Sequence, residues 1–394
     1  MATVPEALRE ALSSLAPGAT VESVSLLSPD VPAGETEKAV GYGKPLRVTL
    51  RETSGARRDL VFRTASGNEF GHDRRADRAE ELLLAFDLFN RIPAHVPALD
   101  VGAIAADGRL VSLRGAGEFY LVTGFARGTL YAEDLRRVAR DGAAGPLDLA
   151  RCDALVAYLA GLHAEKRDDP AAWRRAVRDL VGHGEGIFGM VDGYPPDTPA
   201  APPERLRCIE ERCLSWRWRL RGRAHRLART HGDFHPFNLV FGIPGGPDAP
   251  PDLLAGGQPR PSPLVAPLQP GAEATHFTAL DASRGGQGDP ADDVTALTIN
   301  YVFFALEHHA SWAHGLGVLW RRFWERYLAA TGDAALLESA PPFLAWRALV
   351  LASPRFYPRL PAPARDAVLG LAERALEAGR LDPASAEALF TGPA

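Results

Sequence analysis

Residues 230–241 read Thr230-His231-Gly232-Asp233-Phe234-His235-Pro236-Phe237-Asn238-Leu239-Val240-Phe241. An aspartate and an asparagine stand five positions apart on a turn, and an apolar strand follows them directly. Transfer of a phosphoryl group needs a carboxylate that orients the accepting hydroxyl, and an oxygen ligand that holds Mg²⁺ on the nucleotide phosphates. Asp233 suits the first task and Asn238 the second. The chain has only four asparagines, so an asparagine at this spacing is informative.

A second segment, residues 277–293, supplies further carboxylates. The apolar run Phe277–Leu280 predicts a strand that ends at Asp281, and a carboxylate there is suited to hold a hard cation such as Mg²⁺. The glycines that follow let the backbone turn sharply, and Asp289 and Asp293 come after them. We expect Asp293 either to cap the start of a helix or to brace the loop that carries Asp233.

Together, these segments resemble the signatures of the aminoglycoside phosphotransferase and choline kinase superfamily, which run His-Gly-Asp-x-x-x-x-Asn and, later, Asp…Gly-Asp-Pro-x-x-Asp. The resemblance implies that Asp233 is the catalytic base, that Asn238 and Asp281 bind Mg²⁺, and that His231 and Asp293 brace the catalytic loop. The implied activity is that of a small-molecule kinase, which uses ATP and Mg²⁺ to phosphorylate a hydroxyl. Aminoglycosides, amino sugars and other metabolites are the implied acceptors, and the sequence does not choose among them.

The implied fold is α+β, with two lobes as in protein kinases. The pattern predicts a small antiparallel sheet with one packed helix, Arg74–Phe89, and then a larger and mainly helical part. We expect an N-lobe over residues 1–124 and a C-lobe over residues 125–394, with a Pro- and Gly-rich insertion over residues 242–274. The strands expected in the N-lobe are Val21–Leu27, Arg47–Arg51, Leu60–Ala65 and Glu118–Thr123, and the helices expected in the C-lobe include Leu149–Ala164, Glu204–Arg226, Asp293–His308, Leu316–Ala330, Pro342–Leu351 and Ala362–Ala378.

The N-lobe side of the resemblance concerns the nucleotide. Arg63 stands where a lysine commonly meets the phosphates, and an arginine can donate to them bidentately; a solvated strand-end arginine is the alternative. Glu80 or Glu81 is the expected partner of Arg63. The stretch Leu121–Gly128 resembles the connector whose backbone receives adenine, which places Thr123 and Phe125 at the nucleotide. Two stretches could form the turn over the phosphates, Ser28–Gly34 and Gly41–Gly43.

Composition and charge limit the other classes of function. The 394-residue chain has a formal net charge of −5, which gives no reason to expect a nucleic-acid partner, and we interpret the arginines of residues 217–226 as a solvated helix face. The three cysteines are too few for a disulfide framework. We see no signal segment and no apolar run long enough to span a bilayer, so we expect a cytoplasmic protein without a membrane partner. The sequence leaves the oligomeric state open.

Two other interpretations of the motif remain. His231, Asp233 and His235 could form a metal cluster of a hydrolase, although alternating side chains on a strand would point apart. The second interpretation is a nucleotide-binding pseudokinase that serves as a scaffold. The presence of Asp233, Asn238 and Asp281 argues against it.

Overall fold

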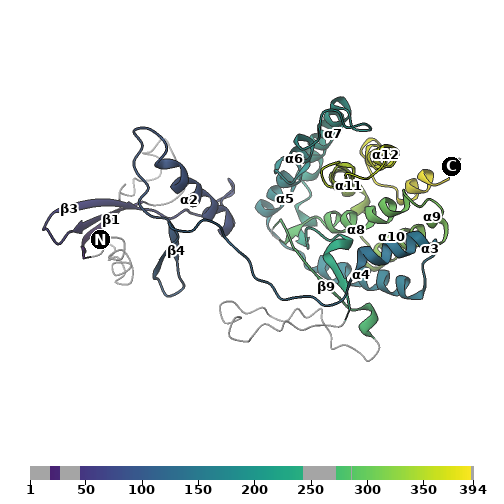
Figure 1. Ribbon diagram of the computed structural model, residues 1–394, viewed down its shortest axis with the longest axis horizontal. Helices are drawn as coiled ribbons and strands as arrows, with labels where there is room; N and C mark the ends of the chain where they lie inside the picture. The colour runs from purple at the N-terminus through teal and green to yellow at the C-terminus, as the bar shows by residue number, and fades with distance from the viewer. Residues whose placement is uncertain (1–17, 27–44, 243–271, 285, 392–394) are drawn as a thin grey trace. The chain divides into compact units, whose positions relative to one another are not determined.

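The computed structural model describes residues 18–26, 45–242, 272–284 and 286–391. The chain divides into two compact units, Met1–Val122 and Thr123–Ala394, and each is described here by itself (Figure 1). Most of the expected insertion at residues 242–274 lies outside the described residues. The two candidate turns over the phosphates, Ser28–Gly34 and Gly41–Gly43, lie outside them as well.

A three-stranded antiparallel sheet forms the centre of the first unit. Its strands are β1 (Thr20–Leu26), β2 (Leu46–Arg51) and β3 (Arg57–Phe62), and β2 lies in the middle. Side chains alternate between the two faces of a strand, so Val48 and Leu50 of β2 are buried together. Thr49 lies on the other face, where its hydroxyl donates to Asp59 of β3 at 2.7 Å.

One helix and one hairpin complete this unit. Helix α2 (Arg75–Phe89) begins where the Asp77 carboxylate accepts from the backbone N–H of Arg74 at 2.7 Å. None of its residues is fully buried, but the expected stripe of Leu82, Leu83, Phe86 and Phe89 is half-buried. The hairpin of β4 (Gly102–Ile104) and β5 (Leu110–Ser112) shares an apolar groove with this helix.

Two strand predictions in the first unit need correction. The strand expected over Leu60–Ala65 ends at Phe62, because Phe62 pairs with Leu46, which is the first residue of β2. Arg63 therefore lies just beyond β3. The strand expected over Glu118–Thr123 is absent: these residues pair with no described strand, and Tyr120 and Leu121 are almost fully exposed.

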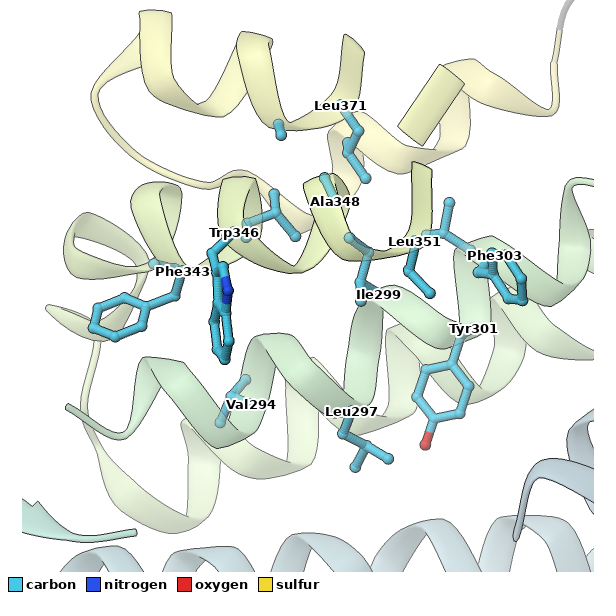
Figure 2. Packing of buried hydrophobic residues seen from close by; sticks show 14 of the residues in the cluster. Val294, Leu297, Ile299, Tyr301, Phe303, Phe343, Trp346, Ala348, Leu351 and Leu371 are labelled. Carbon is cyan, nitrogen blue, oxygen red and sulfur yellow. The ribbon is translucent and has the colours of Figure 1, made fainter. Parts of the chain in front are cut away.

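The second unit is mainly helical. All 15 residues of helix α8 (Ala291–Ala305) are buried, and α10 (Leu316–Thr331) and α11 (Leu336–Ala352) pack against it. Figure 2 shows the α8–α11 contact, with Trp346 of α11 pointing toward α8 near Val294. The other helices are α3 (Tyr131–Asp141), α4 (Pro146–Ala164), α5 (Pro170–Gly182), α6 (Ile187–Asp192), α7 (Pro203–Arg221), α9 (Ser311–His314) and α12 (Ala362–Ala378).

Several helix boundaries differ from the prediction. We expected a helix over Pro342–Leu351, but α11 already begins at Leu336. Proline lacks the N–H that would reach the carbonyl four residues back. For Pro341 that carbonyl belongs to Leu337, and the backbone N–H of Leu381 donates to it instead at 2.8 Å. The helix expected over Glu204–Arg226 ends at Arg221.

Short strands hold the loops of the second unit in place. Strands β6 (Thr129–Leu130), β8 (Leu239–Phe241) and β9 (Phe277–Ala279) form one antiparallel sheet in that order. Strands β7 (Ala228–Arg229) and β10 (Gln287–Gly288) form a second, two-stranded ladder.

The expected α+β, protein-kinase-like class is confirmed: a small antiparallel sheet with one helix comes first, and a larger helical part follows. None of the described helices is both long enough and apolar enough to cross a membrane.

The buried helix α8 gives a direct test of the core. Leu297 is fully buried in α8, whereas Leu214 of α7 is 45% exposed. We expect Leu297→Ala to lower the free energy of unfolding by about 2–5 kcal/mol, because the deletion leaves a cavity in packed surroundings. Leu214→Ala should change it by less than about 0.5 kcal/mol. Urea unfolding followed by circular dichroism measures both, and equal effects would contradict this core.

Candidate active site

The loop that carries His231 to Asn238 joins β7 to β8 and runs beside the segment after β9. Backbone hydrogen bonds connect the two: Ser283 N donates to His231 O at 3.0 Å, and Leu280 N donates to Asn238 O at 2.8 Å. Gly232 has a φ of +85°, and a Cβ at this position would lie 2.4 Å from the Ser283 carbonyl oxygen. Only glycine combines this backbone conformation with so close an approach.

The carboxylate of Asp293 anchors this loop. Its two oxygens accept from the backbone N–H groups of His231 and Gly232, each at 2.8 Å. His163 of α4 contacts the same carboxylate at 3.1 Å and is itself in contact with the Tyr327 hydroxyl at 2.7 Å. Of the two predicted roles, brace and helix cap, the structure shows the brace, since Asp293 lies inside the first turn of α8.

The surroundings of Asp293 keep it ionised. Its side chain is completely buried, and burial by itself raises a carboxyl pKa. The hydrogen bond with His163 and those from the two backbone N–H groups outweigh that effect, so the pKa of Asp293 lies below its ordinary value. This buried charge is stable because two backbone N–H groups and His163 hydrogen-bond to the carboxylate.

His231 is oriented by the backbone around it. Its Nδ1 accepts from the Asp233 N–H at 3.2 Å, and the ring also hydrogen-bonds the backbone of Leu280. Burial lowers the pKa of His231, although the charge of Asp293 opposes the shift. Across residues 18–26, 45–242, 272–284 and 286–391, no three histidine, cysteine, aspartate or glutamate side chains are grouped in a way that could hold a metal ion. This geometry favours His231 as a brace.

Asp233 presents a half-buried carboxylate whose two oxygens have different partners. Oδ1 accepts from Nη1 of Arg347 at 2.7 Å. Oδ2 accepts from Nδ2 of Asn238 at 3.2 Å and lies 3.3 Å from Nε2 of His235. Burial raises the pKa of Asp233, but the hydrogen bond of His235 and the charge of Arg347 together bring it below its ordinary value. The carboxylate is therefore ionised at neutral pH and able to accept a hydroxyl proton.

Arg347 is the residue of this site that the sequence did not single out. It lies on α11, is only 6% exposed, and donates through Nη2 to Gly232 O and to Asp292 Oδ1, each at 3.1 Å. The available signal was a lone charged residue within the apolar run Phe343–Leu349. An arginine so placed is rarely buried without a partner.

Asn238 and Asp281 are oxygen donors on neighbouring chain segments. Asn238 uses its Nδ2 to donate to the carbonyl and the carboxylate of Asp233, which leaves its Oδ1 outside these bonds. Asp281 directly follows Leu280, the residue that pairs with Asn238, and its side chain is exposed. Amide and carboxylate oxygens are ligands that Mg²⁺ prefers, together with phosphates and water, so this donor set fits that cation.

A second buried ion network supports the segment before α8. Arg226 donates to both carboxylate oxygens of Asp289, at 2.7 and 2.9 Å, and also to Asp333. Asp289 in turn accepts from the Ala291 N–H at 2.9 Å, at the start of α8. The Gly-Asp-Pro part of the sequence motif is thus a structural element that fixes the first turn of α8.

The residues predicted to bind the nucleotide from the N-lobe side lie apart from this cluster in the sequence. The Arg63 guanidinium lies over the ring of Phe89, 5.4 Å from its centroid. Within the described part of the chain it forms no ion pair with Glu80 or Glu81; Glu80 is exposed to solvent, and Glu81 contacts His72 at 3.5 Å. The expected Arg63 ion pair is therefore not formed. Thr123 and Phe125 are exposed at the start of the second unit.

The brace at Asp293 leads to a prediction about stability and pH. In Asp293→Asn, the side chain offers only one acceptor oxygen to two backbone N–H donors. We therefore expect the free energy of unfolding to fall by about 2–3 kcal/mol at neutral pH. The folded pKa of Asp293 lies below its ordinary value of 3.8. Its stabilisation is thus present above that value and is lost as the pH falls through the folded pKa. Urea unfolding at pH 7, 5 and 3 should show that the difference in free energy of unfolding between wild type and variant becomes small only at the lowest pH. A difference that disappears between pH 7 and 5 would contradict the role of Asp293 as an ionised brace.

Comparisons with known proteins give one family match and two solved structures of low similarity. A sequence model of the phosphotransferase enzyme family (APH) matches residues 46–248. No curated protein matches the chain. Among solved structures, a glucosamine kinase in complex with glucosamine, ADP and inorganic phosphate is 17% identical, covers 93% of this chain and 98% of its own, and has a TM-score of 0.39. A Plasmodium vivax ethanolamine kinase is 11% identical over 90% of this chain and 84% of its own, with a TM-score of 0.31.

The similarity to the two solved structures is too low to carry the assignment, which rests on the family match. That match spans more than half of the chain and includes the whole loop from His231 to Asn238. The chain therefore belongs to the phosphotransferase enzyme family, as its resemblance to the aminoglycoside phosphotransferase and choline kinase superfamily predicted.

Proposed function

We propose that this chain transfers the γ-phosphoryl group of ATP to a hydroxyl of a small molecule, with Asp233 as the catalytic base. One observation carries the proposal. The loop braced by Asp293 presents an ionised and partly exposed Asp233 carboxylate directly beside Asn238. Phosphoryl transfer depends mainly on positioning and on electrostatic stabilisation, and this loop supplies a fixed carboxylate for the first of these.

The reaction proposed for this site is an in-line displacement. The acceptor oxygen forms a bond to the γ-phosphorus while the bond between that phosphorus and the bridging oxygen of ADP breaks. The proton of the acceptor hydroxyl moves to the carboxylate of Asp233, and ADP leaves with the electron pair of the broken bond. The acceptor would lie beside Asp233, between the catalytic loop and the C-terminal helices.

Asn238 and Asp281 are the residues that would hold Mg²⁺. The cation, when bound, neutralises charge on the nucleotide phosphates. Two protein ligands suffice, because Mg²⁺ usually takes its remaining ligands from phosphate and water. The donation of Asn238 Nδ2 to Asp233 orients the amide, so a single side chain connects the metal position to the base.

The nucleotide would also contact residues of the first unit and of the connector. We assign Arg63 to the phosphates because its guanidinium, stacked on Phe89, makes no ion pair with a described residue. The backbones at Thr123 and Phe125 are assigned to the adenine.

The acceptor belongs to the class of small hydroxylated molecules, such as an aminoglycoside, an amino sugar or another metabolite. A scaffold without activity is the alternative, and the intact set of Asp233, Asn238 and Asp281 argues against it. The hydrolase alternative would require His231 as a metal ligand, whereas its ring is held by the backbone of Asp233 and Leu280.

Asp233 can be tested by an isosteric change. We expect Asp233→Asn to lower kcat by about 10²–10⁴-fold, since an amide cannot accept the hydroxyl proton, with little change in the affinity for magnesium-ATP. ADP release over a panel of hydroxylated metabolites and antibiotics measures turnover. The matched control is Asp197→Asn, because Asp197 is exposed. Undiminished phosphorylation by the Asp233 variant would exclude the base assignment.

Asp281 can be tested separately through the metal. Its φ of +51° lies in the left-handed region, which asparagine tolerates as well as aspartate does. Asp281→Asn therefore removes the charge without straining the backbone. We expect the affinity for magnesium-ATP to fall at least about tenfold, because carboxylate charge sets cation affinity, while the affinity for ATP in EDTA stays the same. Calorimetric titrations measure both, and equal magnesium-ATP affinities would contradict the metal role.

A further inference from the structure

Arg347 contacts the catalytic loop at two places at once. Its Nη1 donates to Asp233 Oδ1 at 2.7 Å, and its Nη2 donates to Gly232 O at 3.1 Å. One guanidinium thus holds both the carboxylate of the proposed base and the backbone next to it. Two rigid donors on one planar group fix an orientation, which a flexible ammonium does not.

The stability of the fold does not account for an arginine at this position. Arg347 is 6% exposed, and its Nε is buried without a hydrogen-bond partner among the described residues. A buried ion pair often contributes no more to stability than apolar residues of similar size would. The neighbours of Arg347 in α11, from Phe343 to Leu349, are otherwise apolar, so an apolar residue would suit the helix.

The guanidinium is itself held by neighbouring groups. It stacks on the ring of Trp346, 3.8 Å from the centroid, and Nη2 also donates to Asp292 of α8. The Trp346 Nε1 donates to Glu185 O at 2.8 Å, which fixes the ring. Trp346 lies in the packed contact between α11 and α8 (Figure 2). The position of Arg347 is therefore set by the core of the unit.

The consequence is an asymmetry between the two oxygens of Asp233. Oδ1 is bound to a permanent cation at 2.7 Å, which makes it the poorer proton acceptor. Oδ2 has only the longer contacts with Asn238 and His235, at 3.2 and 3.3 Å. A proton that arrives from an acceptor hydroxyl is thus directed to Oδ2.

We propose that Arg347 is a positioning residue, which holds Asp233 so that Oδ2 faces the acceptor hydroxyl and receives its proton. This inference rests on the proposed function, because it assigns to Arg347 the orientation of the proposed base. Arg284 also stacks on Trp346 and pairs with Asp292, so the same ring and carboxylate hold a second guanidinium beside that of Arg347.

The test uses two variants of Arg347 in the 394-residue chain. Arg347→Met removes the charge and both donors, and we expect kcat to fall about 10²-fold, the scale of a loss from a misplaced catalytic group. KM for magnesium-ATP should change by less than about threefold, because Arg347 is not assigned to the nucleotide. Arg347→Lys keeps the charge but cannot hold Asp233 and Gly232 together, so its kcat should lie between those of wild type and Arg347→Met.

The matched control is Arg365→Met. Arg365 of α12 is also a buried arginine, 5% exposed, and donates to the carbonyls of Ala352 and Tyr357, each at 2.6 Å, but not to Asp233. We expect this variant to lose thermal stability and to retain the kcat of wild type per folded molecule. Thermal unfolding of each variant supplies the folded fraction.

Turnover is read as ADP release from magnesium-ATP, both with the best acceptor of the panel and with water alone. If Arg347→Met keeps the kcat of wild type, or loses only what Arg365→Met loses, the positioning role is excluded. If wild type releases no ADP, or Asp233→Asn matches wild type, the proposed function has failed instead, and the two failures are distinguishable.

Discussion

The contact between the Asp293 carboxylate and the backbone N–H groups of His231 and Gly232 is the constraint on which the site depends. It connects the first turn of the buried helix α8 to the loop that carries Asp233. The Asp293 carboxylate is fully buried, and it remains stable there because the two backbone N–H groups and His163 hydrogen-bond to it. The loop is therefore positioned by the core of the second unit, and not by its own conformational preference.

Helix α8 serves the site through two adjacent carboxylates. Asp293 points to the loop backbone, while Asp292 pairs with Arg347 and Arg284. Since neighbouring helix positions diverge by about 100° around the axis, the two aspartates reach different partners from one turn. Arg347 of α11 donates both to Asp292 of α8 and to Asp233 of the loop. Backbone and side chain of the proposed base are thus fixed from two helices.

The sequence predicted the local part of this arrangement and, among contacts between distant residues, only the brace that the family resemblance implied. The His231–Asn238 loop and the strand after it follow from short spacings along the chain, whereas Asp293 lies 62 positions from His231, and its bracing role came from the resemblance. Arg347 contacts a residue 114 positions away, and no spacing rule connects such a pair. The absent strand at Glu118–Thr123 has the same cause, because an apolar run becomes a strand only where another strand pairs with it. The early start of α11 depended on Leu381, which replaces the missing donor of Pro341.

The environment of Asp233 bears on what this residue would do as the base of the proposed reaction. A general base is most effective when its pKa is near the working pH, yet His235 and Arg347 lower the pKa of Asp233 against the effect of burial. A carboxylate of this kind is a weak proton acceptor. In a loose transition state the acceptor oxygen keeps its proton until late, so strength as a base contributes little and the direction of the hydroxyl contributes much. In the proposed reaction, the surroundings of Asp233 favour a carboxylate that orients the acceptor first and takes its proton afterwards.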